Sequence, residues 1–271
     1  MEGDISSGER LEKKGARTGN ICLTQSAIHI SSLAEIDIPM LYSFSPSIVP
    51  PPSDWPDWIH TTGYWFLDEP ELSWNPPDSL LDFIKVGPPV YIGFGSIVVQ
   101  DADEMTRIII QAVEQAGVRV ILCKGWSDRL SSGIRTKFKY PDSIHCIDRA
   151  PHDWLFPKMA GVVHHGGAGT TAAGIRAGVP TAIRPFFGDQ YFWAERICDL
   201  GVGVALKKFT VAKLAQALIS ISTDVKMKEK ARILSEKVKR ENGVQTAIQY
   251  VYRDLQLANE QMQSLKAKES N

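Results

Sequence analysis

The chain has 271 residues, a formal net charge of −1 and 44% hydrophobic residues. A charge this close to neutral gives no electrostatic basis for nucleic-acid binding, so we expect no nucleic-acid partner. No apolar run is long enough to cross a bilayer, and the four widely spaced cysteines form no CxxC pair, which favours free thiols in a reducing compartment. We therefore expect a soluble, globular, cytoplasmic chain.

The N-terminal third of the sequence differs in composition from the rest. Residues 1–20 are polar and without periodicity, and we expect a tail there. Residues 39–89 contain eleven of the sixteen prolines and four of the seven tryptophans, a mixture that excludes long helices but is too aromatic for a flexible linker. We therefore predict three parts: the tail, a segment at 21–80 that ends in an ordered connector, and a domain at 81–271.

From residue 90 onward, apolar segments of strand and helix type alternate. We predict strands at residues 90–94, 118–123, 144–147, 161–163, 181–183 and 203–206, and helices at residues 102–116, 190–200, 210–220 and 225–240. Such alternation is typical of an α/β fold, a Rossmann-like, doubly wound parallel sheet. Near the C-terminus, Val244, Ile248, Val251 and Leu255 share one helical face, so we expect that face to dock on the domain.

The most informative segment is residues 161–190, GVVHHGGAGTTAAGIRAGVPTAIRPFFGDQ. A short strand at 161–163 is followed by glycines that let backbone N–H groups approach an anion closely. We predict that Thr170 and Thr171 begin a helix, whose N-terminus carries about half a positive charge and attracts phosphate. The expected diphosphate-binding residues are His165, as a side-chain donor, and Gly167, Ala168, Gly169 and Thr170 in the glycine loop.

Beyond the next predicted strand stand Asp189 and Gln190. An aspartate accepts hydrogen bonds from hydroxyl groups, and a glutamine both donates and accepts them. Because ligands bind at the carboxyl edge of a parallel sheet, this pair is well placed to hold a hexose. The segment therefore predicts a nucleotide-sugar site.

Two other interpretations of these motifs are weaker. Gly167, Gly169 and Ala172 also fit a GxGxxA dinucleotide fingerprint, but the following strand ends in Arg184 rather than in the acidic residue that such a site requires. Asp101 and Asp103 form a DxD pattern that could hold a divalent cation. Since the sequence after Asp101 has the pattern of a capped helix, we favour capping and expect no metal.

Taken together, HHGGAGTT, AGVP, PFFGDQ, PHDWLFP and the GFGS at residues 93–96 resemble the donor-binding signature of GT-B family 1 glycosyltransferases, in particular the fungal sterol type. Residues 42–67 are similar to that family's interdomain segment, and the resemblance covers roughly residues 39–206. It implies UDP-glucose as donor, a sterol or other lipid hydroxyl as acceptor, no metal, and peripheral contact with membranes.

The resemblance also assigns further site residues. It places Ser96 against the β-phosphate and the uracil near Ala150 and His152. Two positions depart from the plant members: Arg149 stands where they carry a uracil-stacking tryptophan, and Ala173 where they carry a ribose-binding glutamate. The ribose-binding residue therefore stays unassigned.

The resemblance further implies an N-terminal domain with the acceptor pocket and the catalytic base, and residues 21–80 are too short to form it. The base is therefore unknown within this chain. Two hypotheses follow: a donor-binding half that works with an acceptor-domain partner or by self-association, or a non-catalytic UDP-sugar-binding chain or truncated fragment.

Overall fold

The computed structural model describes residues 38–66, 74–95, 97, 101–125 and 138–269. The predicted tail at 1–20 lies outside the described residues, and so does Ser96. The described residues from Pro39 onward form one compact unit. The division at residue 80 between connector and domain stays a prediction.

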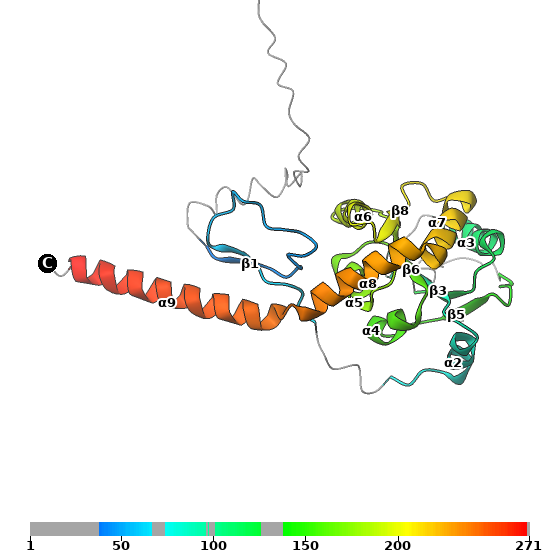
Figure 1. Ribbon diagram of the computed structural model, residues 1–271, viewed down its shortest axis with the longest axis horizontal. Helices are drawn as coiled ribbons and strands as arrows, with labels where there is room; N and C mark the ends of the chain where they lie inside the picture. The colour runs from blue at the N-terminus through cyan, green and yellow to red at the C-terminus, as the bar shows by residue number, and fades with distance from the viewer. Residues whose placement is uncertain (1–37, 67–73, 96, 98–100, 126–137, 270–271) are drawn as a thin grey trace, which may run out of the picture. The chain divides into compact units, whose positions relative to one another are not determined.

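A six-stranded sheet, in which every strand is parallel to its neighbours, organises the chain (Figure 1). Its strands are β3 (Val90–Gly93), β4 (Val120–Cys123), β5 (Ile144–Ile147), β6 (Gly161–His164), β7 (Thr181–Ile183) and β8 (Gly203–Ala205), in the order β5-β4-β3-β6-β7-β8. From β3, successive strands are added on one side as far as β5, and from β6 they are added on the other side as far as β8. This order confirms the predicted Rossmann-like, doubly wound fold.

Helices cover both faces of the sheet. They are α2 (Asp78–Lys85), α3 (Ala102–Ala116), α4 (His152–Leu155), the 3-10 turn η2 (Phe156–Lys158), α5 (Ala168–Ala177), α6 (Gln190–Asp199), α7 (Val211–Thr223), α8 (Val225–Arg240) and α9 (Gly243–Glu269). Most predicted boundaries lie within a few residues of these. The exception that matters for the site is α5, which begins at Ala168 rather than at the threonines.

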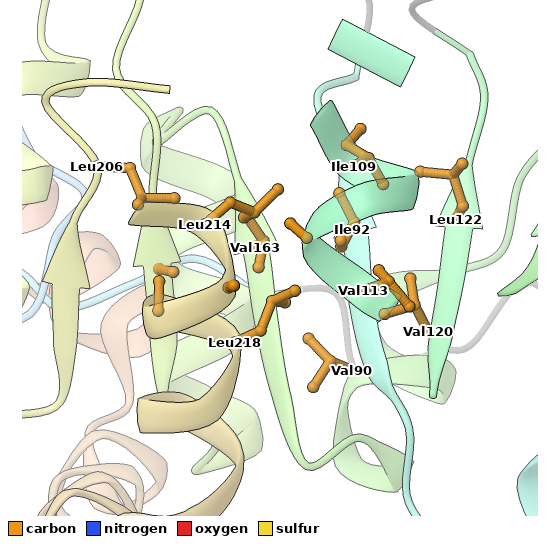
Figure 2. Close-up of a cluster of buried hydrophobic side chains, with 14 of the residues drawn as sticks. Val90, Ile92, Ile109, Val113, Val120, Leu122, Val163, Leu206, Leu214 and Leu218 are labelled. Atoms are coloured by element: carbon orange, nitrogen blue, oxygen red, sulfur yellow. The ribbon is translucent and has the colours of Figure 1, made fainter. Parts of the chain in front are cut away.

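Side chains alternate between the two faces of the sheet along each strand, so the core has one part on each face. On one face, Val90 and Ile92 of β3 point toward α3 and α7, and Figure 2 shows Leu214 and Leu218 of α7 on the same side as Ile109 of α3. On the other face, residues of β3, β4 and β6 pack against α2, α4 and η2 through Tyr91, Ile121, Leu155, Phe156 and Val162. Near-complete burial on both sides explains why these strands are almost continuously apolar.

The connector contains a second, two-stranded parallel sheet, β1 (Met40–Tyr42) with β2 (Ile59–Thr61). It is attached to the C-terminal helices by polar contacts. The Oε1 atom of Glu241 accepts hydrogen bonds from the hydroxyls of Ser45 and Ser47, both at 2.7 Å. Arg196 of α6 donates to the carbonyl of Ile48, whose side chain is fully buried.

Helix α9 docks on this connector, but with a different face from the one predicted. The ring of His60 in β2 stacks on Tyr250 at 3.8 Å between centroids, and its Nε2 atom lies 3.3 Å from the carboxylate of Asp254. The predicted docking residues Val244, Ile248, Val251 and Leu255 are instead 42% to 55% exposed. Periodicity identified an apolar face correctly, but the docking contacts are made by polar and aromatic groups of the adjacent face.

Among the described helices, none combines the length and the apolar character that crossing a bilayer requires.

Candidate functional site

The direction in which strands are added to the sheet reverses between β3 and β6. In doubly wound sheets this switch point, at the carboxyl ends of the strands, is where ligands bind. After β3 comes Gly95, with φ of +64°, and after β6 comes His165. The sequence motif therefore lies at the switch point, at the carboxyl ends of β3 and β6.

The ring of His165 lies between two glycines. A Cβ atom built on Gly95 would be 3.4 Å from its Cε1 atom, and one built on Gly167 would be 2.6 Å from its Nε2 atom. Any side chain at Gly167 would thus collide with the imidazole. The Nδ1 atom of His165 is buried and has no hydrogen-bond partner among the described residues, so the ring has unused hydrogen-bonding capacity.

Helix α5 starts next to this ring with its backbone donors free of a side-chain cap. Its N-cap residue is Gly167, in extended conformation, and among the described residues no side chain caps the first turn. The first backbone bond of the helix runs from the amide of Thr171 to the carbonyl of Gly167, at 2.9 Å. The preceding amides, those of Ala168, Gly169 and Thr170, belong to the turn in which helices bind anions.

A tight turn fixes this arrangement. Gly166 has φ of +93°, and its amide donates to the Nδ1 atom of His164 at 3.0 Å. Because Nδ1 accepts, neutral His164 carries its proton on Nε2, a buried atom with no partner among the described residues. His164 is fully buried and therefore serves the turn, while the solvent-accessible histidine is His165.

Asp189 stands at the start of α6, beyond the end of β7. Its side chain is exposed, and its Oδ2 atom accepts a hydrogen bond from the indole Nε1 of Trp193 at 2.8 Å. Trp193 is 5% exposed, so a nearly immobile donor orients the carboxylate. The other carboxylate oxygen remains free to accept from a ligand hydroxyl.

Gln190 has a different role from the one that its neighbour suggests. It is 4% exposed, and its Oε1 atom accepts from the amides of Phe186 and Phe187 at 2.8 and 3.2 Å. The side chain therefore holds the loop between β7 and α6 in shape. Only its amide nitrogen, which donates no hydrogen bond to the described residues, is left for a sugar.

Ala150 and His152 follow β5, on the far side of β3. Ala150 is half-buried against the second core cluster. The His152 ring stacks on Phe156 at 4.3 Å, and its Nε2 atom lies 3.4 Å from the hydroxyl of Tyr91. Both residues lie near the same sheet edge, with the ring of His152 held by aromatic neighbours.

The electrostatics of the site favour neutral imidazoles. Burial lowers the pKa of His165, although the carboxylate of Asp189 raises it. Burial likewise lowers the pKa of His152, and in this case His165 lowers it further while Asp153 raises it. A neutral imidazole can still donate one hydrogen bond, and an incoming anion would favour its protonation.

The DxD motif is a helix cap. The Oδ1 atom of Asp101 accepts from the amide of Glu104 at 2.8 Å, at the start of α3. Within the part of the chain that the structure describes, no group of three His, Cys, Asp or Glu side chains is arranged to hold a metal ion.

Sequence reasoning missed two residues that support the site. Trp193 orients Asp189, and Tyr91 supports His152 from beneath the site. The first could have been found, because Trp193 stands four residues after Asp189 in a predicted helix, and such residues are neighbours. The second depends on how separate βα units meet, which no local pattern records.

Comparison with known proteins identifies relatives of this chain. Residues 127–253 match the family described as Erythromycin biosynthesis protein CIII-like, C-terminal domain. Just under half of the chain therefore resembles this C-terminal domain. The chain is 51% identical over 246 residues to the sterol 3-beta-glucosyltransferase of Cryptococcus neoformans, and 49% identical over 239 residues to that of Emericella nidulans.

These alignments include 84% and 86% of this chain but only 16% and 17% of the fungal proteins. The chain thus spans about a sixth of the length of these relatives. Among solved structures, the glycotransferase of kitacinnamycin superposes with a TM-score of 0.65 at 17% identity, covering 79% of this chain and 54% of that one. CalG4, the calicheamicin glycosyltransferase, superposes with 0.61 at 17% identity, covering 87% and 59%. Both support the fold.

Proposed function

We propose that this chain is the donor-binding half of a UDP-glycosyltransferase that moves glucose from UDP-glucose to the hydroxyl of a sterol or other lipid. One observation carries the proposal: His165 and the uncapped N-terminus of α5 converge at the switch point of the sheet, with the oriented Asp189 on the next loop. Diphosphate and hexose need these two kinds of site side by side. The names of the fungal relatives support glucose and sterol.

In this proposal, His165 and the amides of Ala168, Gly169 and Thr170 hold the diphosphate. The sugar carbon C1 forms a bond with the acceptor oxygen as its bond to the β-phosphate oxygen breaks. Negative charge grows on the departing UDP, and donors already fixed in place stabilise it most in the transition state. Asp189 and the amide nitrogen of Gln190 orient the glucose for attack from the opposite side.

The acceptor hydroxyl must lose a proton during this step, and we assign the base to an acceptor-binding domain rather than to the described residues. His60, a histidine of the connector, is 6% exposed and is enclosed by Tyr250, Arg253 and Asp254. It is therefore unsuited to meet a substrate. The proposed partners are UDP-glucose, a sterol or lipid, and the acceptor-binding domain.

Calorimetric titration of the purified chain with UDP and with UDP-glucose tests the donor site. Removing the imidazole with His165→Ala should weaken both ligands by roughly ten- to hundredfold, since a hydrogen bond to a charged group is at stake. Asp189→Asn keeps an acceptor for Trp193 but loses the charge. It should weaken UDP-glucose about tenfold and leave UDP unchanged.

Asp224→Asn is a matched control for the aspartate. Asp224 is also an exposed N-cap, whose carboxylate accepts from the amide of Met227 at 3.0 Å. It lies after α7, a helix that runs back from the carboxyl edge of the sheet, so it is at the opposite edge from the site. If the folded wild-type chain binds neither ligand, or if the control weakens UDP-glucose as much as Asp189→Asn does, the proposal is wrong.

Transfer of labelled glucose to a sterol in lipid vesicles separates this proposal from the alternative of a non-catalytic UDP-sugar-binding chain. That alternative predicts the same binding and no transfer, even when an acceptor-binding domain is supplied.

A further inference from the structure

The hydroxyl group of Tyr91 lies at the carboxyl end of β3, next to His152. Tyr91 is the second residue of the strand and is 3% exposed. Its ring extends along the strand over Gly93, the last residue of β3, where a built Cβ atom would lie 2.2 Å from the hydroxyl oxygen. The absence of a side chain at Gly93 therefore lets a buried hydroxyl reach the edge of the sheet where the candidate site lies.

Two side chains adjoin this hydroxyl, those of His152 and Cys123. The hydroxyl oxygen lies 3.4 Å from the Nε2 atom of His152, a long contact of the kind that tightens when a ligand binds. Burial raises the pKa of Tyr91 well above its ordinary value, and the adjacent Cys123 raises it further, so the hydroxyl keeps its proton. The thiol of Cys123 donates its own proton to the carbonyl of Asp148 at 3.3 Å, and its sulfur is a weak acceptor. The imidazole nitrogen is therefore the better acceptor for the tyrosine proton.

A hydrogen bond to one ring nitrogen of a histidine decides which nitrogen carries the proton. Burial, with the nearby His165, lowers the pKa of His152, so the ring is neutral. Stacking on Phe156, at 4.3 Å between centroids and 18° between planes, fixes the plane of the ring. His152 is half-buried, and its Nδ1 atom makes no hydrogen bond with the described residues. This second nitrogen therefore has unused hydrogen-bonding capacity.

We propose that Tyr91 is a positioning residue of the donor site, whose hydroxyl holds His152 in the tautomer that presents an Nδ1–H donor to the nucleotide. The inference rests on the proposed function and adds a residue that acts in it through His152. A nucleotide is rich in acceptor oxygens, so an N–H group binds it, whereas a nitrogen lone pair would repel it.

The opposite arrangement of protons is less favourable. In it, the Nε2 atom of His152 donates to Tyr91, and Tyr91 donates to the sulfur of Cys123. That arrangement replaces a good acceptor with a weak one, and it leaves the lone pair of Nδ1 for the ligand to meet.

Nitrogen NMR of the ligand-free chain, labelled in its histidines and held at about pH 8 so that the rings are neutral, reads the tautomer directly. Neutral histidine in water prefers its proton on Nε2. We expect the proton of His152 on Nδ1 in the wild type and mainly on Nε2 in Tyr91→Phe; the signals lost in His152→Ala identify this ring. The matched control is Tyr64→Phe, which removes the hydroxyl of another buried tyrosine, one in the connector that has no hydrogen-bond partner among the described residues. It should leave the tautomer unchanged.

Calorimetric titration with UDP completes a double-mutant cycle. Tyr91→Phe should weaken UDP roughly three- to tenfold, the worth of one hydrogen bond, and Tyr64→Phe should leave the affinity unchanged. In the His152→Ala background, Tyr91→Phe should have no further effect, because the hydroxyl then has no ring to hold. Far-UV circular dichroism checks that each variant is folded, and His152→Gln replaces the alanine variant in both measurements if the latter does not fold.

The possible results separate this proposal from the proposed function. A wild-type His152 with its proton on Nε2 overturns the role of Tyr91 even if UDP binds tightly. The role is also overturned if Tyr91→Phe binds UDP like the wild type, or if its effect is as large in the His152→Ala background as alone. A folded wild type that binds no UDP overturns the proposed function itself, whichever tautomer His152 adopts.

Discussion

Replacing Gly169 with alanine separates folding from ligand binding more cleanly than any other single change at the site. Gly169 is the second residue of α5 and is exposed, and a Cβ atom built on it meets nothing within 4 Å. Its backbone is helical and needs no glycine. Alanine therefore fits the empty protein without strain, and the methyl group projects from the turn that we assign to the diphosphate.

The substitution should raise the stability of the folded chain and lower its affinity for UDP. Alanine in place of glycine in a helix stabilises the folded chain by roughly 0.5–1 kcal/mol, partly by restricting the unfolded state. For a domain of this size, that raises the melting temperature by about 2 °C. If the diphosphate lies against this turn, the methyl group displaces it from the amides of the first turn and costs about 1.4–2.8 kcal/mol, a ten- to hundredfold loss of affinity.

Differential scanning calorimetry gives the first number and titration with UDP gives the second. A variant that is more stable and binds UDP more weakly supports a cradle at the N-terminus of α5. A variant that is equally or more stable and binds UDP as tightly as the wild type would refute that placement, since no damage to the fold could then conceal a loss of binding.

Three further predictions follow from contacts in the structure. Gly166→Ala should destabilise the chain by roughly 2–4 kcal/mol in chemical denaturation, because φ is +93° and the new Cβ would lie 2.5 Å from the Cγ2 atom of Ile183. A variant with the same free energy of unfolding as the wild type would contradict this prediction. UDP-glucose should bind more tightly as the pH falls from about 8 to about 6, with a change in affinity of less than tenfold per pH unit. The reason is that burial lowers the pKa of His165 in the free chain, whereas the bound anion raises it. If the same pH dependence persists in His165→Ala, another group causes it. Glu241→Ala should speed hydrogen exchange of the connector amides, since it removes the acceptor of the Ser45 and Ser47 hydroxyls. The control is Glu236→Ala, which replaces an exposed residue of α8 and should leave the exchange rates of these amides unchanged.

The sheet and its order were accessible from sequence because the signals are local. Buried parallel strands appear as short apolar runs, and glycine and helix patterns separate them, so β5, β7 and α8 begin and end where the periodicity places them. The start of α5 was predicted two residues late. The sequence Ala168–Gly169 has the composition of a loop, but it becomes helical because the positive φ of Gly166 and the bond to His164 bring the chain into the helix early.

The candidate site was predicted less evenly. The motif identified His165 and Asp189, which the structure brings to one edge of the sheet. Gln190 also fits a sugar ligand by residue type, but its oxygen is held by two backbone amides of the loop. Which polar atom is already satisfied depends on tertiary packing, and residue type does not encode it.

The same limit explains α9. Periodicity located the apolar face, and an apolar face was expected to dock within the chain. Docking instead depends on His60, Tyr250 and Asp254, a contact between residues nearly 200 positions apart. A one-dimensional pattern reports that a face is apolar but not which surface covers it.

The crystal structure of the chain with bound UDP would test the central claim most directly. We expect a diphosphate within hydrogen-bond distance of the His165 imidazole and of the amides of Ala168, Gly169 and Thr170, with the carboxylate of Asp189 beyond the β-phosphate, where the hexose of the donor would lie. UDP bound at any other edge of the sheet, or a diphosphate that touches neither His165 nor the first turn of α5, would contradict it.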